Sequence, residues 1–207
     1  MKFSLAFFFT LITSIPVFSQ LGGNSTYQFL NLISSPRQAA LGGKVITNVD
    51  YDVTQGIYNP ATINIEMDNQ LALNYSNYLG DISYGTAAYA YTIDRRVQTF
   101  HTGITYINYG AFDGYDENGN STGSFTGKET ALSFGYAFQI GFTDFYAGAS
   151  IKLISSKLEQ YSSFGGALDL GLIYIDNYLE FNAAIVLRNI GTPVSYTHLR
   201  AHETFTD

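Results

Sequence analysis

The stretch from Gly119 to Gly123, GNSTG, has the G-x-S-x-G spacing of a serine nucleophile elbow. Such an elbow needs a strand before the serine and a helix after it, and a histidine base must reach the hydroxyl. Here the neighbouring residues are Gly, Asn, Ser and Thr, which favour a hairpin turn. Outside the C-terminal tail the only histidine is His101, which we place on a strand. We therefore predict no catalytic residue and expect that the protein is not an enzyme.

Two further patterns resemble metal sites without meeting their requirements. The acidic segment 113–119, DGYDENG, lacks the D-x-[DN]-x-[DN]-G order of a calcium loop, because Gly114 occupies the place of the first Asp. His198 and His202 are four residues apart, as zinc ligands on one helix are, but they read H-L-R-A-H-E and not H-E-x-x-H. We expect an exposed turn at 113–119, and neither a metal nor another cofactor.

Residues 1–19, MKFSLAFFFTLITSIPVFS, have the features of an export signal. A positive charge at Lys2 precedes an apolar stretch over 5–12, and residues that suit a cleavage site lie just before Gln20. The apolar stretch is too short to cross a membrane as a helix. We predict a cleavable signal peptide at 1–19 and leave it out of the fold argument.

The composition of the chain narrows its class. Charged residues make up 13% of the sequence, about half of the usual share of roughly 25%. Tyr, Phe and Gly are frequent and no apolar run suits a membrane-spanning helix beyond the N-terminus, which favours strands that face lipid on one side and water on the other. The net charge of −7 argues against a nucleic-acid partner. The lack of Cys excludes disulfides.

Apolar residues alternate with small or polar ones over most of the chain after residue 69. Between 130 and 140 every second residue is large and apolar, and the residues between them are Ala, Ser, Gly or Gln. Successive side chains of a strand point to opposite faces, so one face is apolar and the other small or polar. The pattern predicts seven strands, at 70–78, 82–93, 98–109, 130–140, 145–153, 167–174 and 179–188. We expect an all-β fold, a transmembrane antiparallel β-barrel of which 70–193 is a part.

The predicted connections alternate between short and long from the second hairpin on. Outer-membrane barrels have short periplasmic turns and longer external loops, so we place 110–127 and 155–163 outside the cell. Exposed aromatic groups often anchor interfaces. The candidates for partner contact in or beside these loops are Tyr109, Phe112, Tyr115, Phe125 and Tyr161. Packing of the loops on one another would explain the same residues.

The two ends of the mature chain depart from this alternation. Over 20–69 the pattern is irregular, with a short helix predicted from Pro36 to Leu41, ended by Gly42, and a short strand at 45–49. We expect this segment to enter the barrel from the periplasmic side as a plug.

At 194–207, the string VSYTHLRAHET resembles translated sequencing-adapter read-through, so we expect a non-native tail. Seven strands are an odd number for a bacterial barrel, and we expect the chain to be truncated.

Four charged residues fall on the face predicted to line the lumen. They are Lys152, Asp169, Glu180 and Arg188. Charged groups inside a barrel need water or partners, so these side chains could hold the plug or could simply be solvated.

Two motifs in the predicted plug resemble a known superfamily. RQAALGG, ending at Gly42 and Gly43, and the Asn59-Pro60-Ala61 motif before the first strand resemble the plug signature of FadL-like outer-membrane barrels. Several longer segments, among them NQLALNYSNYLGDISYGTAAYAY at 69–91 and TYINYGAFDGYDENGN at 105–120, resemble the PorQ family of the type IX secretion system of Bacteroidetes. The resemblance covers about 20–192.

The resemblance implies a role that the composition alone does not. Members of that family sit in the outer membrane with the sortase PorU, the cargo-binding barrel PorV and PorZ, in the complex that attaches secreted cargo to lipopolysaccharide. It implies a non-catalytic scaffold that anchors PorZ. The FadL-like superfamily also implies an alternative, a transporter of hydrophobic molecules with an apolar pocket between plug and barrel. A soluble β-sandwich enzyme is the third reading, and solubility of the mature chain without detergent would favour it.

Overall fold

The computed structural model describes residues 27–197 apart from 34, 79, 95–97, 160, 177 and 179. The predicted signal peptide and the His198/His202 pair lie outside the described residues. Within the described part of the chain, no helix is long and apolar enough to cross a membrane.

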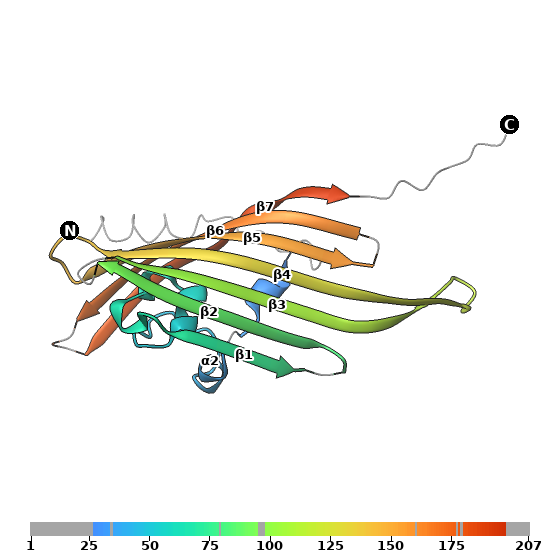
Figure 1. The fold of residues 1–207 in the computed structure, drawn as a ribbon, viewed down its shortest axis with the longest axis horizontal. Coiled ribbons are helices and arrows are strands. Elements are labelled where there is room, and N and C mark those ends of the chain that lie inside the picture. The colour runs from blue at the N-terminus through green and yellow to red at the C-terminus, as the bar shows by residue number, and fades with distance from the viewer. Residues whose placement is uncertain are drawn as a thin grey trace, which may run out of the picture.

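Seven antiparallel strands form one sheet in chain order, which confirms the prediction of an all-β fold (Figure 1). The strands are β1 (Leu71–Asn77), β2 (Ser83–Asp94), β3 (Gln98–Tyr115), β4 (Ser121–Gln139), β5 (Phe145–Leu158), β6 (Tyr161–Asp176) and β7 (Phe181–Thr197). The sheet is not closed, since β1 and β7 are its two edges in the described residues.

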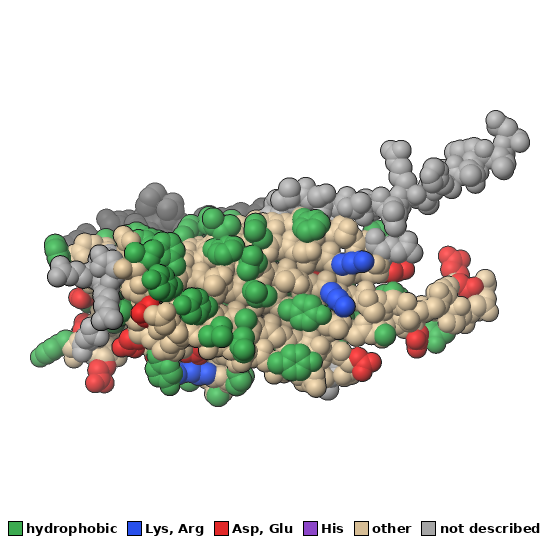
Figure 2. All heavy atoms as spheres, in the orientation of Figure 1, with side chains coloured by type: hydrophobic (Ala, Val, Ile, Leu, Met, Phe, Trp, Pro, Cys, Tyr) green, Lys and Arg blue, Asp and Glu red, His purple; other side chains and the backbone are tan. Residues whose placement is uncertain are grey.

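The two faces of the sheet differ as the alternation predicts. On β4 the buried residues between 130 and 139 are Ala131, Ser133, Gly135 and Ala137, all small, and Gly127 and Glu129 are buried nearer the β3–β4 turn. The residues between them point to the opposite face, where large apolar side chains are exposed on many strands (Figure 2). Examples are Leu73, Tyr75, Phe134, Phe138, Ile151, Leu153, Leu168, Leu170, Leu172, Ile185 and Leu187.

The strands are longer than predicted, so the prediction of two long loops, at 110–127 and 155–163, is wrong. β3 and β4 continue to a tight turn at 116–120, and their hairpin projects beyond the other strands (Figure 1). A bulge between Asn108 and Ala111, with Gly110 at φ 79°, shifts the alternation of side chains by one residue. The end of β3 is therefore not recognised as strand from a pattern that repeats every second residue. At the second site, serines on both strands mask the pairing of β5 with β6.

β7 also runs beyond the boundary predicted at 193. Its backbone pairs with β6 as far as Thr197, so the first residues of the expected tail continue the strand.

Short helical turns make up the segment before the sheet. They are η1 (Gln28–Asn31), α2 (Pro36–Ala40), η2 (Val53–Ile57), η3 (Pro60–Thr62) and η4 (Ile65–Met67). Side chains of Ser35, Asp52, Asn59 and Asn64 accept a backbone N–H at the start of the last four, as N-caps do. The predicted helix at Pro36 is therefore confirmed, and Gly42 follows it at φ 90°.

The strand predicted at 45–49 does not form. The backbone of Val45 forms hydrogen bonds with the side-chain amide of Gln38 and not with a neighbouring strand. The Gln38 Oε1 accepts from the Val45 N–H at 2.8 Å and its Nε2 donates to the Val45 carbonyl at 3.4 Å. Side-chain hydrogen bonds of this kind compete with sheet pairing.

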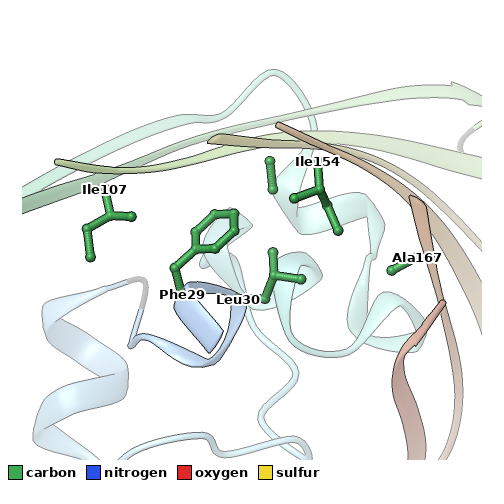
Figure 3. Close-up of a cluster of buried hydrophobic side chains, with 6 residues drawn as sticks. Phe29, Leu30, Ile107, Ile154 and Ala167 are labelled. Carbon is green, nitrogen blue, oxygen red and sulfur yellow. The ribbon is translucent and has the colours of Figure 1, made fainter. Parts of the chain in front are cut away.

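The core lies between this N-terminal segment and the face with small residues. Phe29 and Leu30 of η1 pack against Ile107, Ile154 and Ala167, under strands that curve over them (Figure 3). A second cluster joins Val53, Ile57 and Met67 to Ala88 and Ala90 of β2. The segment therefore provides the apolar core that a single open sheet lacks.

Glycines on β5 and β6 let the backbone of this segment approach the sheet closely. A Cβ added at Gly148 would overlap the carbonyl group of Pro60, and one at Gly171 would overlap the Asn59 side chain. By contrast, a Cβ at Gly166 would meet only the Lys152 carbonyl oxygen, at 3.7 Å. The Asn59-Pro60-Ala61 turn is therefore in close contact with both strands, whereas the sheet leaves room for a Cβ at Gly166.

Gly148→Ala is expected to destabilise the protein by about 2 kcal/mol or more, since overpacking a tight contact typically costs about 1–3 kcal/mol. Gly166→Ala is the matched control and should change the free energy of unfolding by less than about 0.5 kcal/mol. Denaturant unfolding of the full chain measures both. Equal effects of the two variants would contradict the close packing.

Candidate functional site

The most strongly buried charged groups lie where the N-terminal segment meets β5, β6 and β7. Lys152 of β5 and Asp169 of β6 both point to the buried face, and their Nζ and Oδ2 atoms are 2.5 Å apart. Their side chains are 3% and 0% exposed. Burial of two charges is costly unless both are paired, so their surroundings must supply further partners.

A bulge in β7 supplies those partners. The register between β6 and β7 shifts from Leu168 to Leu170, and Asn189 adopts a left-handed backbone with φ 54°. In this conformation the Asn189 N–H donates to Asp169 Oδ1 at 2.7 Å, and its side-chain Oδ1 accepts from Lys152 Nζ at 2.8 Å. One asparagine therefore serves both members of the ion pair. Asn tolerates this backbone better than most residues.

Arg188, next to Asn189, links the sheet to the N-terminal segment. Its guanidinium lies over the ring of Tyr58, 5.1 Å from the centroid, and its Nη2 donates to the Leu30 carbonyl at 3.4 Å. The Tyr58 hydroxyl in turn donates to the Leu32 carbonyl at 3.0 Å. Partial burial and, after it, the charge of Arg188 lower the pKa of Lys44 in the same segment. The basic groups near one another are therefore Lys44, Lys152 and Arg188, and Asp169 is the carboxylate that lies among them.

Three of the four residues predicted to line the lumen come together in this cluster. Glu180 does not. It lies in the turn before β7 and lines a separate cavity of about 520 Å³ between the N-terminal segment and the turn end of the sheet. Sequence reasoning missed Asn189 and Tyr58, because no local pattern signals a bulge or a stacked arginine.

The two halves of the predicted plug motif have different surroundings. Asn59 is fully buried, accepts from the Ala61 N–H and donates from Nδ2 to the Ile46 carbonyl at 2.7 Å. Pro60 and Ala61 lie with it against the glycines of β5 and β6. Gly42 and Gly43 end α2 with positive φ, and added Cβ atoms there would meet nothing within 4 Å. Their role is therefore conformational.

The five aromatic residues predicted to contact a partner do not form one patch. Phe112 and Phe125 face each other across β3 and β4 with ring centroids 5.3 Å apart, and Tyr115 is exposed near the tip of the same hairpin. Tyr109 is instead tied to the sheet, because its hydroxyl donates to Glu129 Oε2 at 2.6 Å. Tyr161 is exposed on the neighbouring β5–β6 hairpin.

The tip of the β3–β4 hairpin is an ordered acidic turn at 116–120, shorter than the turn predicted at 113–119, because residues 113–115 belong to β3. Asp116 Oδ1 accepts from the N–H groups of Asn118 and Asn120, and its Oδ2 accepts from the Asn120 side chain. These bonds, led by that of the Asn120 side chain, lower the pKa of the Asp116 carboxyl. The GNSTG stretch falls in this turn and the start of β4, so the serine is followed by a strand and not by the helix of a nucleophile elbow.

A serine, a histidine and an aspartate also lie in one row on the buried face, but they lack the geometry of a catalytic triad. Pairing across the strands places His101, Gly135, Ser150 and Asp169 in one row. His101 and Ser150 are two strands apart, roughly 10 Å, which is beyond hydrogen-bond reach. The His101 Nε2 lies 2.8 Å from the Val53 carbonyl oxygen of the N-terminal segment. No group of three metal-ligating side chains occurs in the described ranges.

Comparisons with protein-family models, with curated proteins and with solved structures find no match to this chain. They identify no family, and the resemblances given above stay expectations.

Lys152→Met is expected to lower the free energy of unfolding by about 3–5 kcal/mol, because it leaves the charge of Asp169 buried without its ion-pair partner. In Lys152→Met/Asp169→Asn the new amide still accepts the Asn189 N–H, so the double variant should recover about 2 kcal/mol of that loss. A double-mutant cycle by denaturant unfolding measures the coupling. Simple additivity of the two single changes would contradict a coupled cluster.

Proposed function

We propose that the chain forms the wall and the N-terminal plug of an outer-membrane β-barrel. The observation that carries this proposal is the apolar outer face of the seven strands, together with a polar, packed inner face. In the described part of the chain nothing covers that outer face, and exposed apolar patches of this extent mark sites that meet lipid or another protein. Strands of 12 to 19 residues in β2 to β7 are long enough for a tilted crossing.

Within the membrane the protein would act as a non-catalytic scaffold. The projecting β3–β4 hairpin supports this role, because its stacked Phe112 and Phe125 rings and exposed Tyr115 offer apolar anchors on an ordered support. By the family resemblance, the partner is PorZ, and through it PorU and PorV in the complex that links cargo to lipopolysaccharide. This is the role that we propose.

The cavity of about 520 Å³ favours a second candidate, transport of small molecules. It lies between the N-terminal segment and the sheet, where a FadL-like transporter would hold its ligand. However, Glu66, Asp176 and Glu180 line it, and their carboxylates would repel the head group of a fatty acid. Scaffolding therefore remains the first proposal.

Removing the stacked rings should abolish recovery of the partner. The tagged full-length protein is purified from outer membranes, and PorZ is quantified by mass spectrometry. We expect Phe112→Ser/Phe125→Ser to reduce PorZ recovery at least about tenfold, a loss of roughly 1.4 kcal/mol of binding free energy. Phe142→Ser/Tyr178→Ser is the matched control, since these residues are 108% and 94% exposed in turns at the opposite end of the sheet.

The control variant should retain PorZ as the unmodified protein does. Purification of the unmodified barrel without PorZ, but with a bound apolar molecule, would replace the scaffold proposal by transport. Equal losses in both variants would contradict a role for the hairpin.

A further inference from the structure

Two lysines lie side by side at the edge of the apolar outer face. Lys128 of β4 and Lys157 of β5 are directly paired across the two strands, and both are exposed. They belong to a polar row that runs across the sheet from Asn77 of β1 to Thr197 of β7. One step inward on the same face come Thr130 and Ser155, and then the apolar Leu132 and Leu153.

Like charges directly opposite each other on a sheet are destabilising unless a counter-charge lies between them. Among the described residues, neither ammonium group is within 4.0 Å of a carboxylate. The acidic residue next in sequence, Glu129, points to the other face, where it accepts from Tyr109. The pairing therefore places two cationic groups together on the outer face, and no carboxylate of the described residues forms an ion pair with either.

We infer that Lys128 and Lys157 bind the phosphate of an anionic lipid head group in the leaflet next to the projecting hairpin. This inference rests on the proposed placement in the outer membrane. A phosphate has enough acceptor oxygens for both ammonium groups, and lysines at the end of a membrane-spanning segment extend their charged ends to the head-group level. Figure 2 shows basic side chains on this face near the end from which the hairpin projects.

The position fixes which part of the lipid is recognised. On this face the apolar pair Leu132 and Leu153 is separated from the lysine pair only by Thr130 and Ser155. Acyl chains would therefore lie along the leucines while the phosphate reaches the lysines. Anionic lipids of the outer leaflet, such as the lipid A part of lipopolysaccharide, carry phosphates at this depth. The site would thus hold a lipid phosphate rather than dissolved phosphate.

The test compares the full-length protein in vesicles of phosphatidylcholine alone with vesicles that also contain lipid A. Thermal midpoints are measured for the unmodified protein, Lys128→Gln/Lys157→Gln and the charge-conserving Lys128→Arg/Lys157→Arg. We expect lipid A to raise the midpoint of the unmodified and arginine proteins, and at least half of that rise to be lost in the glutamine variant. Inorganic phosphate added to phosphatidylcholine vesicles should cause no rise.

An equal rise in the unmodified and glutamine proteins would overturn the inference, as would an equal rise with inorganic phosphate. Either result leaves the outer-membrane proposal in place, because the proteins would still have inserted. Failure of all three proteins to insert into either kind of vesicle would instead contradict that proposal.

Discussion

The close packing of the N-terminal segment against the sheet is the constraint on which the rest of the structure depends. The backbone of Pro60 and the side chain of Asn59 occupy the space that side chains at Gly148 and Gly171 would fill. Where the Asn59-Pro60-Ala61 turn lies against β5 and β6, only glycine fits on the buried face of the sheet. Elsewhere the buried face packs small and polar side chains and a few apolar ones, such as Ile107 and Ile154, against the N-terminal segment. Many large apolar residues lie on the other face, which is the proposed contact with lipid.

The charge cluster has a different part in the same interface. Lys152, Asp169 and Asn189 pair with one another within the sheet, whereas Arg188 reaches across to Tyr58 and the Leu30 carbonyl. Buried ion pairs of this kind add little net stability compared with apolar packing, but an unpaired member is costly. The cluster therefore fixes the position of the segment on the sheet more than it strengthens the fold. Its location between two parts of the chain suits a rigid scaffold.

The sequence predicts those features that depend on an uninterrupted local pattern. The alternation over 130–140 correctly assigns both faces of β4, and the Pro36 and Gly42 signals correctly bound α2. Prediction fails where a tertiary contact replaces the local rule. The bulges at Gly110 and Asn189 break the alternation, and the Gln38 side chain binds Val45, which the pattern assigned to a strand. Three of the four charged residues predicted to line a lumen are brought together by the pairing of the strands, which no spacing along the chain reveals.

The central claim is that alternate residues of β4 face lipid and the packed interior. The 207 residues contain no Cys, so a single cysteine introduced among them gives one defined position for a spin label. Labels at Leu132, Phe134, Tyr136 and Phe138 of the full-length protein in vesicles should collide with oxygen dissolved in the bilayer, and labels at Ala131, Ser133, Gly135 and Ala137 should not. An alternation with a period of two would support the account. Equal accessibility along the strand, or greater access to a water-soluble quencher at the apolar positions, would contradict it.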